Sequence, residues 1–306
     1  MTAATATSAD ARSRRLFFER VGLPIGLQCY TLGEEPKADL DATFARIAAI
    51  GYREIELSEL YGRTPAQVKA ATDRAGLTIG CIHLAVSTNP GAASHGLSLD
   101  SPPQQIADNL GVLGVHAGVL PIAPFPGPMK PREGEGVMQM LSRMFAEAGP
   151  DHWKHTAAML NERAALLKPL GIAVGYHNHN LEFAPTGGTT GWDILVHETD
   201  PALVHFEVDV GWVAAAGLDP VAFLRRHNGR VRWLHIKDLK ADTQPNFGLS
   251  MHPTEVGTGE QDWAHILPAA HAAGVRHFYV EQQPPFSIPR MEAAARSFAY
   301  LAQLRA

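Results

Sequence analysis

The sequence predicts a single α/β domain, a (β/α)8 TIM barrel. Three observations support this fold class: short apolar runs alternate with helix-like segments, the same glycine-containing junction recurs between them, and polar residues stand where several runs end. A chain of 306 residues is long enough for one such barrel, because α/β barrels commonly reach this size as a single unit.

Eight runs rich in Val, Ile, Leu and aromatic residues are the predicted strands. They lie at residues 25–30, 54–58, 78–86, 114–122, 171–177, 203–209, 231–237 and 277–281. The segments between them have apolar residues three and four apart, which is typical of helices; examples are residues 40–50, 64–75, 151–170 and 263–273. Strands that alternate with helices, without a hairpin signal, predict a parallel sheet, and eight units predict its closure into a barrel.

The junctions from helix to strand share one pattern. Gly51, Gly76, Gly171 and Gly274 each follow a helix-like segment and precede an apolar run. Glycine just past a helix adopts the left-handed conformation that ends it, so the repetition marks repeated α-to-β junctions. An open doubly wound sheet is the competing fold, but no Gly-rich phosphate loop follows the first run.

The chain divides into a short leading part and one large domain. We expect residues 1–22 to be a flexible N-terminal tail and leading segment, and residues 23–306 to form the barrel. Residues 121–150 are dense in Pro and Gly and contain a helix-like stretch. This segment is too long for a plain connection, so we interpret it as an elaborated loop that could cover the site as a lid.

Composition excludes several function classes. The formal net charge is -5 and no run of Lys or Arg occurs, so we expect no nucleic-acid partner. Arg14 and Arg15 resemble a twin-arginine export signal, but Glu19 and Arg20 interrupt the apolar stretch that should follow. No apolar run approaches the roughly 18 residues of a membrane span. Two cysteines inside apolar runs suit buried thiols in a reducing compartment, and we therefore expect a cytoplasmic location.

Acidic or imidazole groups close four successive predicted strands in the second half of the chain. Glu182, Asp209, His235 and Glu281 each stand where an apolar run gives way to a loop. A parallel barrel carries its catalytic groups at these strand ends. The simplest interpretation is one metal site assembled from four strand ends.

The segment after the fifth strand is densely polar. In the sequence YHNHNLEF, His177 and His179 lie on the same side of an extended chain, because side chains alternate with period two. Glu182 follows in the same short loop. A surface turn with solvated histidines is the alternative, but three more strands end in the same way, which favours a functional cluster.

The sixth strand carries three polar residues on one face: His205, Glu207 and Asp209. Burying them without partners would cost several kcal/mol, and a cation at the strand end would offset part of that cost. Asp209 is the strongest candidate ligand. Trp212 follows closely, either as a wall of the ligand pocket or as a core residue.

Charged residues also follow His235 on the seventh strand. Lys237 faces the same way as His235 and could bind a substrate oxygen or donate a proton, or could be a solvated lysine. Asp238 faces the other way and could orient His235 or cap the following turn. Weaker candidates for substrate binding are Glu56, His83, His116 and His252; a single strand histidine is more often a hydrogen-bonded core residue.

Several motifs in this order resemble the sugar phosphate isomerase/epimerase family with the xylose isomerase-like barrel. They are GLQCYTLG, GYREIEL, YHNHNLEF, VDVGW, HIKD, GTGEQDW and VEQ, and the resemblance extends from about residue 23 to near the end of the chain. It implies one divalent ion, manganese, cobalt, zinc or magnesium, held by Asp209, His235, Glu281 and an acidic group from strand five. We assign Glu182 as that fourth ligand. An imidazole in its place is the alternative, because His177 stands at the position of the family's strand-end Glu.

The resemblance also implies an activity. We expect a metal-dependent isomerase or epimerase that abstracts a proton beside the carbonyl of a ketose or keto-sugar, through a metal-stabilised enediolate. His177, His179 and Lys237 are the expected acid–base groups. Loss of a β-substituent from the same intermediate would make the protein a dehydratase or lyase instead. The partner would be a small-molecule sugar, and because family members are often dimers or tetramers, we expect a homo-oligomer.

Two other function classes rank lower. Endonuclease IV-type nucleases resemble the same barrel but need further His and Asp ligands, and here Trp212 stands three residues after Asp209 where a His would be needed. A non-catalytic sugar-binding barrel is the third alternative.

Overall fold

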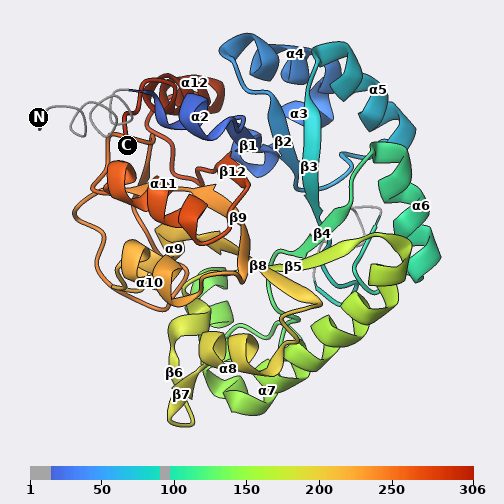
Figure 1. Ribbon diagram of the computed structural model, residues 1–306. Helices are drawn as coiled ribbons and strands as arrows, with labels where there is room; N and C mark the ends of the chain where they lie inside the picture. The colour runs from blue at the N-terminus through green and yellow to red at the C-terminus, as the bar shows by residue number, and fades with distance from the viewer. Residues whose placement is uncertain (1–14, 90–96) are drawn as a thin grey trace, which may run out of the picture.

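Eight parallel strands form a closed barrel in the computed structural model, which describes residues 15–89 and 97–306. The barrel order is β1-β2-β3-β4-β5-β8-β9-β12, with β12 pairing back to β1 through Gly26 and Tyr279. The strands are β1 (Gly26–Gln28), β2 (Glu54–Leu57), β3 (Thr78–His83), β4 (Ala117–Leu120), β5 (Ala173–His177), β8 (Val204–Asp209), β9 (Val231–Ile236) and β12 (His277–Val280). Helices surround the strands (Figure 1), and the predicted fold class is confirmed.

The helices and the smaller strands fill the connections. The helices are α2 (Phe17–Val21), α3 (Glu35–Ala38), α4 (Leu40–Ile50), α5 (Pro65–Ala75), α6 (Pro103–Leu113), α7 (Val137–Leu167), α8 (Gly191–Glu198), α9 (Val210–Ala215), α10 (Pro220–Arg226), α11 (Trp263–Ala272) and α12 (Arg290–Leu301). Two antiparallel pairs lie outside the barrel, β6 (Pro185–Thr186) with β7 (Thr189–Thr190) and β10 (Asp238–Leu239) with β11 (Pro253–Thr254).

Local signals explain where several helices begin and end. The Asp39 side chain accepts a hydrogen bond from the backbone N–H of Ala42 at the start of α4. Thr64 and Gln67 form a reciprocal capping box at the start of α5, and Gly76 ends that helix with φ 68°. Such caps satisfy backbone groups that the helix itself leaves unpaired.

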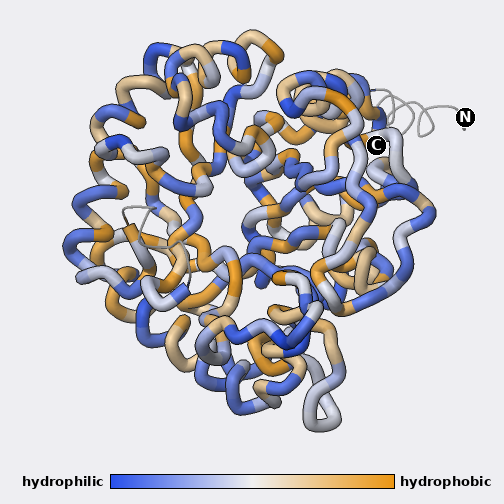
Figure 2. Tube along the Cα trace, turned by 180° about the vertical axis from the view of Figure 1, so that it is seen from behind, coloured by the Kyte–Doolittle hydropathy of each residue, from blue (hydrophilic) through white to orange (hydrophobic). Residues whose placement is uncertain are grey.

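The core follows from the two-residue period of the strands. Outward side chains such as Ile55, Leu234 and Phe278 are fully buried and pack against the helices. Inward side chains from the middle of the strands form a small apolar cluster that includes Cys81, Val119, Trp233 and Tyr279. Hydrophobic and hydrophilic residues alternate along the peripheral helices in Figure 2, as expected for helices with one buried side.

The leading segment is partly built into the domain. Residues 1–12, expected to be a loose tail, lie outside the described part of the chain. Phe17 and Phe18 of α2 are buried and pack edge-on against Phe278 of β12. The N–H of Phe17 donates to the carbonyl of Leu304, so both ends of the described chain meet at one side of the barrel (Figure 1). The structure thus joins residues 17–21 to the barrel that we expected to begin at residue 23.

The 121–150 segment combines a loop with the first part of a long helix. Helix α7 begins at Val137 and is interrupted at Gly149, whose φ of 72° and ψ of -177° are not helical. The loop before α7 starts with Pro121 and Ile122, which line the mouth of the barrel. Across residues 15–89 and 97–306, no helix has the length and apolar character needed to cross a membrane.

Candidate metal centre

Four potential ligands converge at the carboxyl ends of the barrel strands. His177 ends β5, Asp209 ends β8, His235 lies near the end of β9 and Glu281 follows β12. One ligand atom of each lies within 4.8 Å of one from every other, and all four residues are buried. Carboxylate and imidazole ligands in a closed site suit divalent cations such as zinc or manganese.

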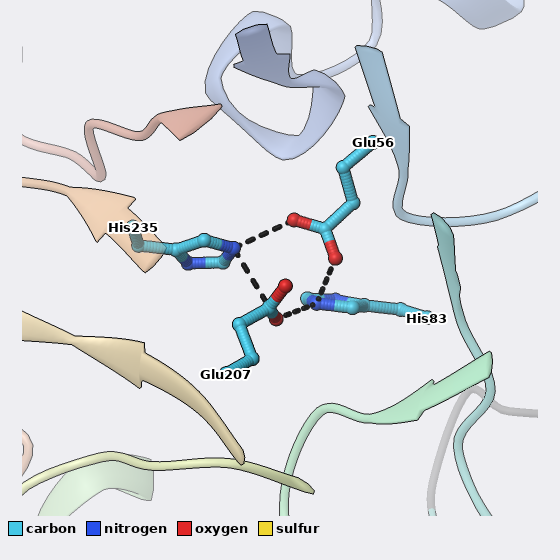
Figure 3. Close-up of side chains that lie close together, drawn as sticks. All are labelled: Glu56, His83, Glu207 and His235. Atoms are coloured by element: carbon cyan, nitrogen blue, oxygen red, sulfur yellow. Dashed lines mark hydrogen bonds and ion pairs between the residues drawn. The ribbon is translucent and has the colours of Figure 1, made fainter. Parts of the chain in front are cut away.

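A second group lies beside the first and shares His235. It consists of Glu56 from β2, His83 from β3, Glu207 from β8 and His235 itself (Figure 3). His83 Nε2 lies 3.0 Å from Glu56 Oε1 and 3.0 Å from Glu207 Oε2. His235 Nε2 lies 2.6 Å from Glu56 Oε2 and 3.3 Å from Glu207 Oε2. On the other side of the ring, His235 Nδ1 lies 2.9 Å from Glu281 Oε2. His235 is therefore in contact with carboxylates through both ring nitrogens.

Lys237 is a fully buried cation that joins two of the candidate ligands. Its Nζ lies 2.5 Å from Asp209 Oδ2 and 2.8 Å from Glu281 Oε2. Gly211 makes room for its stem, because a Cβ there would lie 2.7 Å from Lys237 Cγ. Trp212 lies with its ring centroid 5.1 Å from Nζ and 5.3 Å from the ring of His179. Lys237 is thus a buried residue of the site and not a solvated one, and Trp212 is part of its wall.

The buried carboxylates have opposite pKa shifts. Burial, and then the charge of Glu56, raises the pKa of Glu207 to about 7. Burial also acts against ionisation of Glu56, but the positive charges and hydrogen bonds of His83 and His235 outweigh it and hold the pKa of Glu56 well below its usual range. Lys237 and His235 likewise overcome burial and lower the pKa of Glu281. Unequal pKa values are expected where carboxylates crowd together, because they cannot all ionise at equal cost.

The histidines of the site also have opposite pKa shifts. Burial opposes protonation of His83 and His235, yet the adjacent Glu56 and Glu207 carboxylates raise the pKa of His83 to about 10 and that of His235 well above its usual value. Burial and the neighbouring His235 hold the pKa of His177 well below its usual value. Burial and the charge of Lys237 lower the pKa of His179 to about 4. His177 and His179 are accordingly neutral imidazoles near pH 7.

A small cavity opens beside the first group of ligands. It has a volume of about 190 Å³ and is lined by Tyr30, His83, Pro121, Ile122, His177, His179, Glu281 and Gln283. Larger hollows exist on the outer surface of the barrel, for example between α8 and α10, but their lining includes none of the converging ligands. The mouth of the barrel is therefore the place where a substrate would meet those ligands.

Glu182 does not belong to either group of converging ligands. The chain turns after His177, and the 3-10 turn at Leu181–Phe183 points the Glu182 carboxylate back toward its own strand. Tyr176 Oη donates to Glu182 Oε1 at 2.6 Å, and the backbone N–H of His179 donates to Oε2 at 3.0 Å. Glu182 thus braces the loop that carries His179, and His177 is the residue of strand five that reaches Asp209, His235 and Glu281.

Glu182 provides a test of this bracing role through pH. Burial raises the pKa of Glu182 to about 7, although Tyr176 and the His179 N–H oppose the shift. A carboxyl whose pKa is raised in the folded state stabilises the protein below its unfolded pKa, near 4.5, and loses that contribution as pH rises through 7. Glu182→Gln mimics the protonated form, so relative to this variant the wild type should lose roughly 3 kcal/mol of unfolding free energy between pH 4.5 and 7.

The measurement is urea denaturation of the two proteins at pH 5 and pH 8. Between pH 5 and pH 8 the unfolding free energy of the wild type should fall relative to that of the variant. An equal dependence of the unfolding free energy on pH in the two proteins would contradict the raised pKa of Glu182.

Two expected substrate-binding residues lie away from the site. His116 precedes β4 and lines a hollow at the opposite end of the barrel, together with Glu54 and His277, because it stands before the strand and not at its carboxyl end. His252 is exposed and pairs with Asp242 at 2.8 Å. Glu56, His83 and Trp212 do lie at the site. The structure therefore brings together most, but not all, of the expected residues.

Asp238 has a structural role instead of a contact with His235. Its carboxylate accepts hydrogen bonds from the backbone N–H groups of Gly257, Gly259 and Gln261, and from Trp263 Nε1. These bonds hold the loop between β11 and α11 against the start of β10. Asp238 Oδ1 also accepts a hydrogen bond from the N–H of the next residue, Leu239, at 2.9 Å, so Asp238 binds backbone groups that follow it, and these bonds do not orient His235.

Glu207 is a site residue that the sequence analysis left unassigned. It lies two residues before Asp209 on the inward face of β8, so the period of the strand places it one layer deeper in the same barrel. Its Oε2 contacts His83 and His235. The signal was present in the shared face of His205, Glu207 and Asp209, but only the contacts with His83 of β3 and His235 of β9 show that Glu207 lies at the site.

The residues at the first group fit a divalent metal ion. The group offers two carboxylates and two imidazoles, all buried and within reach of one another. His177 Nδ1 is buried and makes no hydrogen bond, which leaves that imidazole with an unsatisfied polar atom at the site. Buried polar atoms normally find a partner, and a cation among these groups would bind the lone pair of a neutral imidazole that makes no hydrogen bond within the protein.

Comparison with known families identifies the fold family. Residues 44–304 match the sequence profile described as xylose isomerase-like TIM barrel. The chain belongs to this family. Within the family, an inosose dehydratase from Lacticaseibacillus casei is 24% identical over 301 residues, covering 91% of this chain and 94% of that enzyme.

Two further relatives show a similar relation. An inosose dehydratase from Clostridium tetani is 35% identical over 114 residues, a match that covers 36% of this chain and only 38% of that enzyme. The crystal structure of a sugar phosphate isomerase/epimerase from Parabacteroides distasonis superimposes with a TM-score of 0.71 at 25% identity, covering 92% of this chain and 94% of the other. The relatives therefore include both dehydratases and an isomerase/epimerase.

Proposed function

We propose that this protein is a divalent-metal-dependent enzyme that removes a proton beside the carbonyl group of a small, uncharged polyhydroxy ketone. The observation that carries the proposal is the convergence of His177, Asp209, His235 and Glu281 at the carboxyl end of the barrel, next to the cavity. These four residues would hold the ion. A bound divalent ion polarises a carbonyl and a neighbouring hydroxyl, which lowers the cost of removing the proton between them.

The residues of the chain supply the proton transfer. His179 lines the cavity, and its Nδ1 is buried without a hydrogen bond. Since its pKa is lowered to about 4, it is a neutral imidazole near pH 7 with a nitrogen free to accept a proton. Lys237, whose pKa is raised because Asp209 and Glu281 outweigh the effect of burial, keeps its proton and balances the charge of these two carboxylates.

Two outcomes follow from the same first step. Protonated His179 can return its proton to a different carbon, which isomerises the ketone; a proton delivered to the other face of the same carbon epimerises it. It can also give the proton to a departing β-hydroxyl, so that the C–O bond breaks and water leaves. The inosose dehydratases support the second outcome at least as well as the isomerase/epimerase from Parabacteroides distasonis supports the first.

The cavity favours a small substrate without a phosphate group. Its volume of about 190 Å³ is below the roughly 300–1,000 Å³ of pockets that take drug-sized ligands. Among the described residues that line it, none is Lys or Arg. Lys237 lies close by but is fully buried and already bonded to Asp209 and Glu281. A phosphate group would find no free Lys or Arg side chain to bind among these residues.

The proposal is tested by incubating the protein with Mn²⁺, Co²⁺, Zn²⁺ or Mg²⁺ and a panel of ketoses, 3-keto sugars and inososes in D₂O. We expect deuterium incorporation or loss of one water from at least one uncharged compound, and a KM at least about tenfold higher for its phosphate ester. If no compound exchanges deuterium or loses water with any of the four ions, the proposal is wrong.

The ligand from strand five is tested by metal affinity. His177→Ala should weaken binding of Zn²⁺ to the metal-free protein by about 100-fold, because one of four ligands is lost. The Glu182 carboxylate is bonded to Tyr176 and lies outside both groups of converging ligands. Glu182→Gln should therefore change the zinc affinity by less than about threefold. Competition with a chromophoric chelator measures both values, and the reverse order would return Glu182 to the role of ligand.

A further inference from the structure

The two ring nitrogens of His235 face two different sets of carboxylates. Nδ1 faces the first group, at 2.9 Å from Glu281 Oε2 and 3.7 Å from Asp209 Oδ2. Nε2 faces the opposite way, at 2.6 Å from Glu56 Oε2 and 3.3 Å from Glu207 Oε2 (Figure 3). His235 therefore stands between the converging ligands on one side and a buried pair of glutamates on the other.

A neutral imidazole cannot use both nitrogens as ligands. One nitrogen carries the proton and donates, and the other has the lone pair that binds a metal. A carboxylate that accepts the proton of the first nitrogen selects the tautomer, fixes the plane of the ring and makes the second nitrogen more basic. The orientation of His235 meets this requirement, with Glu56 as the nearest acceptor.

We propose that Glu56 is a positioning residue that holds His235 with its proton on Nε2, so that Nδ1 is presented to the metal ion together with Asp209 and Glu281. The inference rests on the proposed function, since it concerns the same metal site. It gives Glu56 a role other than the substrate contact expected from the sequence.

The surroundings of Glu56 are built to hold it as an acceptor. Its side chain is fully buried, and its second oxygen, Oε1, lies 3.0 Å from His83 Nε2 and 3.2 Å from Cys81 Sγ. Both oxygens are thus engaged, Oε1 by β3 and Oε2 by β9, which fixes the plane of the carboxylate. Such a buried carboxylate would be costly without these partners.

Glu207 and His83 complete the support. His83 Nε2 lies 3.0 Å from an oxygen of each glutamate, so it bridges the two carboxylates. Glu207 Oε2 is farther from His235 Nε2 than Glu56 Oε2 is, at 3.3 Å against 2.6 Å. We therefore assign the principal hydrogen bond of His235 to Glu56, and a secondary contact to Glu207.

A matched control lies on the same strand. Glu54 is two residues before Glu56, is also buried, and pairs with a histidine, His277, at 3.0 Å. It lies at the other end of β2, away from both groups of ligands. Glu54→Gln therefore removes another carboxylate–histidine pair of the same strand, one whose histidine is partly exposed, without touching His235.

The experiment compares Zn²⁺ affinity in wild type, Glu56→Gln and Glu54→Gln by competition with a chromophoric chelator, after removal of bound metal. Glu56→Gln should weaken binding by about 10- to 100-fold, as is usual when the acceptor behind a ligating histidine is lost. Glu54→Gln should stay within about threefold of wild type. Glu56→Asp, which keeps the charge, should recover part of the loss.

A second readout does not depend on the metal affinity of a Glu56 variant. Nitrogen-15 NMR of the zinc-loaded wild type should show one histidine with a protonated Nε2 and a metal-bound Nδ1, and a His235→Gln spectrum identifies it. A metal-bound Nε2, or two zinc ions per chain with one on the Glu56 side, would overturn the inference.

Failure of this inference can be distinguished from failure of the proposed function. If the wild type binds none of the four divalent ions, the proposed metal site itself is wrong. If the wild type binds zinc and Glu56→Gln binds it as tightly as Glu54→Gln does, only the positioning role of Glu56 is wrong.

Discussion

Glu281→Gln is expected to abolish most of the turnover while leaving the fold intact. Glu281 takes part in several features of the site: it contacts His235 and Lys237, it belongs to the first group of ligands, and it lines the cavity. An amide in its place keeps the shape of the side chain but removes the anionic ligand. Loss of about 4 kcal/mol of transition-state stabilisation corresponds to a fall in kcat/KM of about 10³-fold.

Stability of the metal-free protein should also fall in this variant, but less than activity. The Glu281 carboxylate contacts the two buried cationic groups of the site, Lys237 and His235, and they lower its pKa. Removing its charge takes one anionic partner from each of them, so the melting temperature of the metal-free variant should lie below that of the wild type.

The measurements are kcat/KM on whichever ketone the wild type converts, and thermal melting with and without Mn²⁺. Mn²⁺ should raise the melting temperature of the wild type, because an ion that binds the folded state stabilises it. It should have little effect on the variant, which lacks one of the four ligands and should bind the ion weakly. A variant that keeps near-normal turnover would rule out Glu281 as a ligand.

Lys237→Met is expected to give the largest loss of stability. The substitution keeps the length of the side chain but leaves Asp209 and Glu281 without the cation that lies 2.5 Å and 2.8 Å from their oxygens. Removing one partner from a buried ion pair costs about 3–5 kcal/mol, because the remaining charge stays buried and unpaired. The metal-free variant should lose about this much unfolding free energy.

A divalent ion should reverse part of that loss. Asp209 and Glu281 would be ligands of the ion, so a bound cation compensates their charge in place of the ammonium group. Melting temperatures of the variant with increasing Mn²⁺ measure this effect. Lys240→Met, in the same segment but exposed, should change the unfolding free energy by no more than about 0.5 kcal/mol. If Lys237→Met is no less stable than Lys240→Met, the buried ion pairs do not stabilise the protein as described.

The ends of the predicted strands could be found from the sequence because they depend on local pattern. Alternation with period two places His235 and Lys237 on the inward face of β9, and the step to a loop after each apolar run marks the carboxyl end of the barrel. For this reason Asp209, His235 and Glu281 could be selected as candidate ligands before any contact was known, and the structure brings all three together.

The direction in which the side chains of the segment after β5 point could not be predicted from this local pattern. His177 and Glu182 are five positions apart in one polar segment, and either could reach a metal from a strand end. The turn after His177, and the hydrogen bonds from Tyr176 and His179 to the Glu182 carboxylate, direct Glu182 away from the ligands. These bonds depend on how the loop closes, which residue type alone does not determine.

The sequence by itself therefore determined the barrel, the inward face of the strands that end near Asp209 and His235, and the end of the barrel at which the candidate ligands converge. Only the tertiary structure decided which inward residues meet: that Glu56 and Glu207, from strands far apart in the chain, face the same nitrogen of His235, and that His116 lies at the opposite end. The physical reason is that side-chain alternation is a property of one strand, whereas the pairing of β2, β3, β8 and β9 across the barrel depends on the register of every strand between them.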